Sequence, residues 1–309
     1  MKYVCSITIL TLLLVGGPRI CAAADAAGEQ SAETTAGPNA FRPPASVGHS
    51  PAKPPSLLAR AVRIPDGPAF SRLALWSGVS LAQGLLACDK TFDIWGKPDG
   101  KFHLKNDFSD DQLALSDEVS HLLIAYKLAQ LARQGYRWGG LSPAAAARAG
   151  AIQAAIYMAF VEFPLDAYNP DQGLGLTDLL ADFAGIGLAW YRAGIDNPRW
   201  DLKVSVKSRF FAGNSRLLAH TNKQYDDFIY WLTYRISANR YNPLVLGIGY
   251  STHHPPGDPP SHIPVDKQIY FRIGTSLSEI GRIFGRRTER LLSPAEVYFF
   301  NVGPRTSWR

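Results

Sequence analysis

The residues best suited to chemistry lie between positions 107 and 187, and they surround one histidine, His121. Asp117 precedes this histidine by four positions and Glu118 by three, so on a helix both carboxylates lie beside the imidazole. Later segments supply further acids in an otherwise apolar context: Glu162, Asp166, Asp178 and Asp182. We therefore expect these groups to meet in one polar centre between helices.

A divalent cation is one candidate occupant of this centre. A histidine with carboxylates from several helices suits zinc, iron or manganese, and the Glu118-x-x-His121 spacing occurs in di-iron helix bundles. The second Glu-x-x-His pair of those bundles is missing here. The candidate metal ligands are Glu118, His121, Glu162 and Asp178. The alternative is a structural hydrogen-bond network, in which Asp117 pairs with His121 while Asp178 and Asp182 satisfy helix ends and a neighbouring arginine.

Hydrolysis is a further hypothesis, because a histidine beside a carboxylate can activate water or a serine, and Ser120 precedes His121. Adjacent residues on a helix point about 100° apart, which is poor geometry for a nucleophile and its base. The sequence also lacks the G-x-S-x-G and H-E-x-x-H motifs. The residues therefore favour a centre without catalysis over a hydrolytic one.

Three helices are expected to position the acids. The first follows an S-x-x-Q capping box at residue 109 and runs to about residue 133. The second spans residues 142–161, starts with Ser-Pro and is apolar on all sides, so it should be buried in protein or in lipid. Pro164 ends or kinks it. The third spans residues 177–191, where Gly185 and Gly187 permit close packing.

The rest of the chain predicts an α+β fold. An apolar helix over residues 72–87 should be buried and would complete a bundle of about four helices. Short alternating or aromatic-rich segments then predict a small antiparallel sheet with strands at 202–211, 228–236, 244–250 and 268–273.

An amphipathic helix over residues 276–292 should close the chain. Arg282, Arg286 and Arg290 line one face of it, opposite large apolar residues. This is the layout of an interfacial helix that meets anionic lipid at a membrane surface. An amphipathic helix that packs on the strands and exposes its arginines to water would have the same pattern.

The N-terminal residues 1–24 are typical of an export signal, since Lys2 precedes a short apolar run and Ala22 to Ala24 offer a cleavage site. Residues 25–56 are rich in Ala, Pro, Gly, Ser and Thr, which predicts a disordered linker. The remaining residues, 57–309, should form a single folded domain with a helical part at 57–197 and a strand-rich part at 198–309.

Composition limits the classes of partner. The chain has 309 residues, of which 46% are hydrophobic, so it can bury one substantial core or two smaller ones. Its net charge of +6 is spread along the sequence, which is a weak basis for nucleic-acid binding, and we expect no nucleic-acid partner. An anionic membrane surface suits this charge equally well.

The order of the motifs between residues 76 and 250 resembles the YfiM-like family of predicted periplasmic or outer-membrane lipoproteins, which is defined by a domain of unknown function. The matching pieces are Asn-Asp-Phe at Asn106, Asp117 with His121, Arg137-Trp138-x-Gly140, Glu162 with Asp166, the glycine-flanked acids between Gly175 and Gly185, the strand at Lys203, and the segments from Tyr225 and Asn242.

A more distant similarity is to VanZ-like membrane proteins, which carry a comparable order of acidic residues and histidine on membrane helices. Glu118 stands where these families usually have lysine, and Asp182 where they usually have asparagine, so the centre here is more acidic. The resemblance implies an envelope location and a shared fold.

Together these features predict an exported, membrane-associated protein of the periplasm or outer membrane, with a buried Asp/Glu/His centre and no catalysis. The alternative is a metal-dependent hydrolase that acts on a lipid or cell-wall substrate.

Overall fold

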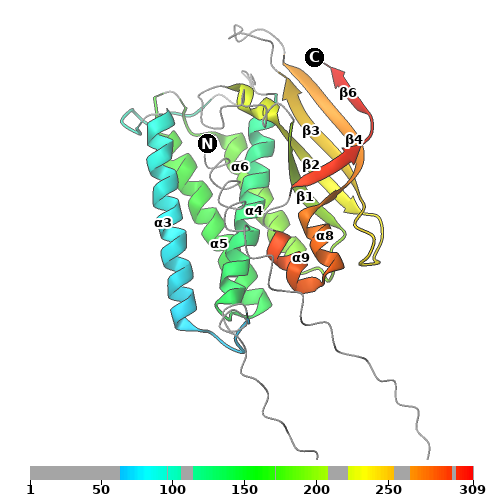
Figure 1. Cartoon of the computed structure of the whole chain (residues 1–309). Helices are drawn as coiled ribbons and strands as arrows, with labels where there is room; N and C mark the ends of the chain where they lie inside the picture. The colour runs from blue at the N-terminus through cyan, green and yellow to red at the C-terminus, as the bar shows by residue number, and fades with distance from the viewer. Residues whose placement is uncertain are drawn as a thin grey trace, which may run out of the picture.

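The structure, a computed structural model, describes residues 63–95, 97–105, 114–170, 172–207, 222–253, 265–293 and 297–308. It confirms a mixed α+β fold, in which helices from the first part of the chain stand beside an antiparallel sheet from the later part (Figure 1). The predicted export signal, the linker, the Asn-Asp-Phe segment at Asn106 and the capping box at Ser109 lie outside the described residues.

The helical part consists of α3 (Phe70–Trp95), α4 (Ser116–Trp138), α5 (Pro143–Phe160) and α6 (Leu176–Ala193). Helix α4 packs against both α5 and α6, and these two also pack against each other. Their shared core includes Tyr126, Ala154, Met158 and Ile186. The predicted start of α5 is confirmed, because the Ser142 side chain accepts a hydrogen bond from the backbone N–H of Ala145 at 3.2 Å.

Helix α5 continues into a π-helical segment, η2 (Val161–Asp166), at Pro164. Proline cannot donate the backbone hydrogen bond that a regular helix requires, so the predicted break of the helix is confirmed at this point. The segment places Glu162 and Asp166 in the interior, since both side chains are buried.

Small residues allow α4 to lie close to its neighbours. A Cβ atom on Gly185 would lie 2.2 Å from the carbonyl oxygen of Leu122, so a side chain there would separate α6 from α4. A Cβ atom on Gly187 would have nothing within 4 Å, so the prediction of close packing is confirmed for Gly185 and wrong for Gly187.

The prediction of a buried helix at residues 72–87 is wrong. Helix α3 lies at the edge of the helical part (Figure 1) and contacts α4 mainly through Trp76 and Leu73, which lie against Gly135 and Gly139. Its large apolar side chains are otherwise exposed, among them Leu75, Leu81, Leu85 and Leu86. A regular bundle of four helices is therefore not confirmed, because only α4, α5 and α6 share the core.

Within the described part of the chain, six strands form one antiparallel sheet: β1 (Trp200–Val206), β2 (Phe228–Arg235), β3 (Val245–His253), β4 (Asp266–Ser276), β5 (Tyr298–Val302) and β6 (Arg305–Trp308). The first four were predicted, whereas β5 and β6 were missed. The strand order is β1-β2-β3-β4-β5, with β6 also on β4. An isolated bridge between Val204 and Val297 brings β1 near β5, so the sheet curls on itself.

The inside of this curled sheet has its own apolar core around Trp231, whose ring centroid lies 4.8 Å from that of Tyr298. The opposite face contacts the helical part at one end, where Val204, Phe228 and Tyr230 pack against Leu123 of α4. This contact joins the two parts of the molecule.

The predicted closing helix over residues 276–292 is wrong in two respects. It is divided into α8 (Leu277–Ile283) and α9 (Arg286–Leu292) by Gly285, whose φ of 119° is a conformation that favours glycine. The two last strands, β5 and β6, follow it in the chain.

The predicted arginine face is wrong for Arg282. Arg282 is buried, forms an ion pair with Glu279 at 3.0 Å and donates to the backbone carbonyl of Asn242 at 2.6 Å. Arg286 is exposed, and the side chain of Arg290 lies outside the described residues. Arg282 therefore holds α8 in place and cannot belong to a membrane surface.

Candidate functional site

Three helical segments bring the predicted polar centre together. Asp117 and His121 come from the first turns of α4, Glu162 from η2, and Asp178 and Asp182 from the first turns of α6. Negative charge is stabilised near helix N-termini, which helps to place acids in the first turns of α4 and α6. The centre is interior, and the imidazole of His121 is fully buried with 0% exposure.

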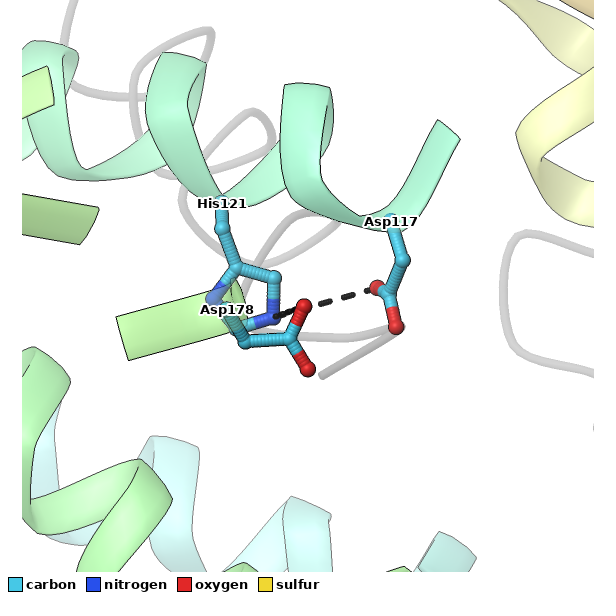
Figure 2. A group of neighbouring side chains, drawn as sticks. All are labelled: Asp117, His121 and Asp178. Atoms are coloured by element: carbon cyan, nitrogen blue, oxygen red, sulfur yellow. Dashed lines mark ion pairs between the residues drawn. The ribbon is translucent and has the colours of Figure 1, made fainter. Parts of the chain in front are cut away.

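The two ring nitrogens of His121 have different surroundings. Nδ1 lies 3.0 Å from Oδ1 of Asp182, which is a hydrogen bond, and 3.6 Å from Oε1 of Glu162. Nε2 lies 3.8 Å from Oδ1 of Asp117 and 3.8 Å from Oδ1 of Asp178, and both distances are too long for hydrogen bonds (Figure 2). The bond to Asp182 therefore assigns the proton of the neutral ring to Nδ1 and leaves the Nε2 lone pair directed toward the other two acids.

Two residues that the sequence analysis missed complete the centre. Nζ of Lys105 lies 3.1 Å from Oδ2 of Asp178 and 3.4 Å from Oδ2 of Asp117. The loop that carries Lys105 is held at the start of α6 by a backbone hydrogen bond to Leu174 at 3.0 Å. Tyr225, from the short helix η3 (Asn222–Asp227) before β2, donates its hydroxyl to Oδ1 of Asp117 at 2.5 Å.

These contacts shift the acid–base equilibria of the centre. Burial lowers the pKa of His121, but the hydrogen bond and charge of Asp182 outweigh it and raise that pKa to about 10. Burial raises the pKa of Asp117, but the charges of His121 and Lys105 and the bond from Tyr225 outweigh it, so its pKa lies below the ordinary value. The raised pKa of His121 favours its protonated form near pH 7, and a metal ion would compete with a proton for Nε2.

The other acids titrate above their ordinary range. Burial, followed by the charge of Asp117, raises the pKa of Asp178, and burial also raises the pKa of Asp182. Burial raises the pKa of Glu162 to about 8, which favours its neutral form near pH 7. The centre thus has more carboxyl groups than its described cations neutralise.

Several buried polar atoms of the centre have no hydrogen-bond partner among the described residues: His121 Nε2, both carboxyl oxygens of Glu162, Asp178 Oδ1 and Asp182 Oδ2. An unsatisfied buried polar group costs about 1–3 kcal/mol, so a further group that bonded to these atoms would stabilise the centre. The arrangement could hold a metal ion, either between Asp117, His121 and Asp178 or between His121, Glu162 and Asp182.

The predicted ligand set of Glu118, His121, Glu162 and Asp178 is wrong as a single site. Glu162 and Asp178 approach opposite nitrogens of the ring. Glu118 belongs to neither candidate group; its Oε1 accepts a hydrogen bond from Thr177 Oγ1 at 3.3 Å and links α4 to α6. Asp166 is buried nearby but also stands outside both groups, and its backbone carbonyl accepts from Asn169 and Gly173.

A second buried charge cluster, also missed, lies at the junction of α4, α6 and β1. Asp201 accepts a hydrogen bond from the hydroxyl of Tyr126 at 2.5 Å. Three cations approach its carboxylate: Lys127 at 3.7 Å, Arg192 at 3.5 Å and Lys203 at 3.5 Å. The sequence did not predict this cluster, because its residues lie within helices and an alternating strand and no local motif links them.

Comparison of the chain with models of protein families, with curated proteins and with solved structures found no match. The similarity to YfiM-like and VanZ-like proteins therefore stays a prediction.

Proposed function

We propose that this protein is a membrane-associated component of the cell envelope whose apolar outer surface lies against lipid. The observation that carries this proposal is the concentration of large exposed apolar side chains on the outer faces of α3, α5 and α6. They include Leu81, Leu85 and Leu86 on α3, Ile152, Ile156 and Phe160 on α5, and Leu176, Leu180, Phe183 and Trp190 on α6. Exposed apolar side chains in such number mark interaction sites in folded proteins.

Helix α5 with η2 supports contact with lipid most directly. The stretch Pro143–Asp166 is long and apolar enough to cross a membrane, and only 33% of its most apolar window is buried. A core helix of a soluble protein would be mostly covered, whereas this one leaves Ile156 60% exposed. The exposed apolar side chains of α5 are explained if lipid acyl chains surround the helix.

The outer face of the sheet also exposes large apolar side chains. The register places Leu232 of β2 beside Ile248 of β3, and Ile248 beside Phe271 of β4. A second row across the same three strands contains Tyr234, Leu246 and Ile273. All six side chains of the two rows are exposed. The inside of the sheet combines the apolar core around Trp231 with charged groups such as Arg235, which pairs with Glu279, so both faces of this sheet carry large apolar side chains.

Flotation with lipid vesicles tests this proposal. We expect the detergent-purified chain, once the detergent is removed, to float with neutral phosphatidylcholine vesicles and to stay bound in high salt, because apolar contact is not screened. The double variant Ile152→Glu with Ile156→Glu should lose most of this binding. The matched control is Arg286→Glu, which changes an exposed charge outside the apolar faces.

The controls separate apolar from electrostatic association. Binding that requires anionic lipid, falls with salt and disappears in Arg286→Glu would contradict the apolar proposal. A chain that stays folded and ignores both kinds of vesicle would contradict membrane association altogether.

The envelope location is proposed from two features of the sequence. The pattern of residues 1–24 is typical of an export signal, and the similarity to YfiM-like proteins implies the periplasm or the outer membrane. Fractionation of bacterial cells that produce the full chain tests this proposal. Recovery in the cytoplasmic fraction with residues 1–24 still attached would contradict it.

A metal-dependent hydrolase acting on a lipid or cell-wall substrate is the second candidate function. It is favoured by the buried imidazole whose Nε2 faces two carboxylates, since such sets hold metal ions that activate water. The test is turnover of phospholipid and peptidoglycan by the metal-loaded chain. Lack of turnover by a chain that contains metal would exclude this candidate.

A further inference from the structure

We infer that Asp117, His121 and Asp178 form a binding site for one divalent metal ion that accepts mixed nitrogen and oxygen ligands, such as Zn²⁺ or Mn²⁺. The inference deepens the second candidate function, but it does not require that any substrate is hydrolysed. It also replaces the ligand set that the sequence predicted with a different set of atoms.

The choice between the two sides of the imidazole follows from its hydrogen bonds. Nδ1 is engaged by Asp182 at 3.0 Å, so the Glu162 side of the ring has no lone pair to offer a metal. Nε2 is completely buried and, within the described structure, has no hydrogen-bond partner. It is directed at Oδ1 of Asp117 and Oδ1 of Asp178, which Figure 2 shows converging on the same nitrogen.

The spacing of these three groups suits an ion. One ligand atom from each residue lies within 4.8 Å of the other two. Metal–ligand bonds of about 2.0–2.6 Å on opposite sides of an ion give a span of this size. The distances of 3.8 Å from Nε2 to both carboxylates are too long for direct hydrogen bonds and leave space between the groups.

Neighbouring residues hold the three ligands in this orientation. Asp182 is a positioning residue, because its hydrogen bond from Nδ1 fixes the ring and increases the electron density on Nε2. Lys105 contacts the Oδ2 atoms of Asp117 and Asp178, so Oδ1 of Asp178 faces the ion, while Oδ1 of Asp117 is held in place by the hydroxyl of Tyr225 and would bind the ion through a second lone pair. The Lys105 side chain is 32% exposed, whereas that of Asp178 is 5% exposed.

The donor set indicates the class of metal. Two carboxylates and one imidazole suit Zn²⁺, Mn²⁺ or Fe²⁺, whereas Ca²⁺ and Mg²⁺ prefer ligands that are all oxygen. Three protein ligands leave a coordination position for water or for a substrate atom, as in catalytic zinc sites.

Metal loading of the full chain tests the inference. The purified protein is treated with chelator, incubated separately with Zn²⁺, Mn²⁺, Ca²⁺ or Mg²⁺, desalted and analysed for metal. We expect about one Zn²⁺ or Mn²⁺ per chain and a concentration-dependent rise in Tm with these ions. Replacement by Co²⁺ should give a visible absorption spectrum with nitrogen and oxygen ligation.

Substitutions of single side chains identify which residues bind the ion. Asp117→Asn, His121→Ala and Asp178→Asn should each abolish stoichiometric loading, while Asp182→Asn should weaken metal affinity roughly 10- to 100-fold through the orientation of the ring. The matched control is Glu118→Gln, which removes a carboxylate next to Asp117 on the same helix and should keep full loading. Circular dichroism verifies that each variant is folded.

Three results would overturn the inference. They are a folded wild-type chain that takes up no ion, full loading in Asp178→Asn, and a loss of loading in Glu162→Gln while Asp117→Asn keeps it. The last result would place the ion on the Nδ1 side. Stoichiometric metal without turnover would support the inference and exclude only the hydrolase.

Discussion

At the scale of residues, three clusters of charged side chains lie inside the molecule. Asp117, His121 and Asp178 converge in the helical part, Asp201 meets three cations at its boundary with the sheet, and Arg235 binds Glu279 inside the sheet through Nε and a terminal nitrogen at 2.9–3.1 Å. Buried ions need partners, because removing one partner leaves a charge in a medium of low polarity. Each cluster is therefore sensitive to single substitutions.

The Asp201 cluster predicts a specific dependence of stability on pH. Burial raises the pKa of Asp201, but Arg192, Lys127 and Lys203 and the hydrogen bond from Tyr126 outweigh it and hold that pKa well below the ordinary value. Its contribution to stability is thus present above the pKa of the unfolded chain, about 3.9, and is lost as the pH falls below that value.

We therefore expect Asp201→Asn to lower the free energy of unfolding at pH 7 by about 3–5 kcal/mol, because three buried cations lose their counter-ion. The difference between wild type and variant should shrink as the pH falls from 6 toward 2.5. Denaturant unfolding at several pH values measures this difference. A constant difference across that range would show that the Asp201 charge contributes nothing.

At the scale of elements, the separation of α4 from α6 determines whether the centre exists, because the two helices carry His121 and its acidic neighbours. Gly185 allows the close approach, since a Cβ atom there would lie 2.2 Å from the Leu122 carbonyl oxygen. Gly187, on the same helix two positions later, has open space around it.

The different surroundings of Gly185 and Gly187 predict opposite effects when each glycine is replaced by alanine. Gly185→Ala should destabilise the protein by about 1–3 kcal/mol, because the helices must move apart to accept the methyl group. Gly187→Ala should be neutral or stabilise by up to about 1 kcal/mol through helix propensity. Urea unfolding of both variants measures the effects, and equal changes would contradict the close contact of α4 and α6.

At the scale of the whole molecule, the distribution of polarity is the feature that most needs an explanation. Large apolar side chains are exposed on the helices and on the outer face of the sheet, while the interior contains ion pairs and a histidine centre beside its apolar cores. Water would disfavour this arrangement, and a surrounding of lipid acyl chains would stabilise it. The surface and the buried centre together thus support the membrane-associated function that we propose.

Tryptophan fluorescence in vesicles that contain brominated lipid tests this distribution. Trp190 is 57% exposed on α6, whereas Trp231 is 1% exposed inside the sheet. Bromine quenches fluorophores that it contacts, so Trp190→Phe should reduce the quenched fraction of the emission and Trp231→Phe should not. Unchanged quenching in Trp190→Phe would show that α6 does not face lipid.

Local spacing in the sequence was sufficient to predict part of this structure. Asp117 and His121 lie four residues apart and had to share a helix face, and the Ser-Pro signal located the start of α5. The alternating segments predicted the first four strands. The acids on η2 and α6 were expected near His121 because isolated acids in apolar helices need polar partners.

The remaining features depend on contacts between distant segments, which spacing does not encode. Lys105 and Tyr225 reach Asp117 from 12 and 108 residues away, and only the packing of the chain assigns Asp182 to one ring nitrogen and Asp178 to the other. Arg282 contacts Glu279 and the backbone carbonyl of Asn242, which lie far from each other in the sequence, instead of facing a membrane.

An apolar helix has the same sequence pattern in a protein core and in lipid, since both environments exclude polar side chains. The sequence by itself therefore determined that α3 and α5 would be apolar helices and that acids would gather around His121. Only the tertiary structure decided that the apolar faces of these helices point outward and that Nε2 meets Asp117 and Asp178, because helix rotation and distance are set by packing.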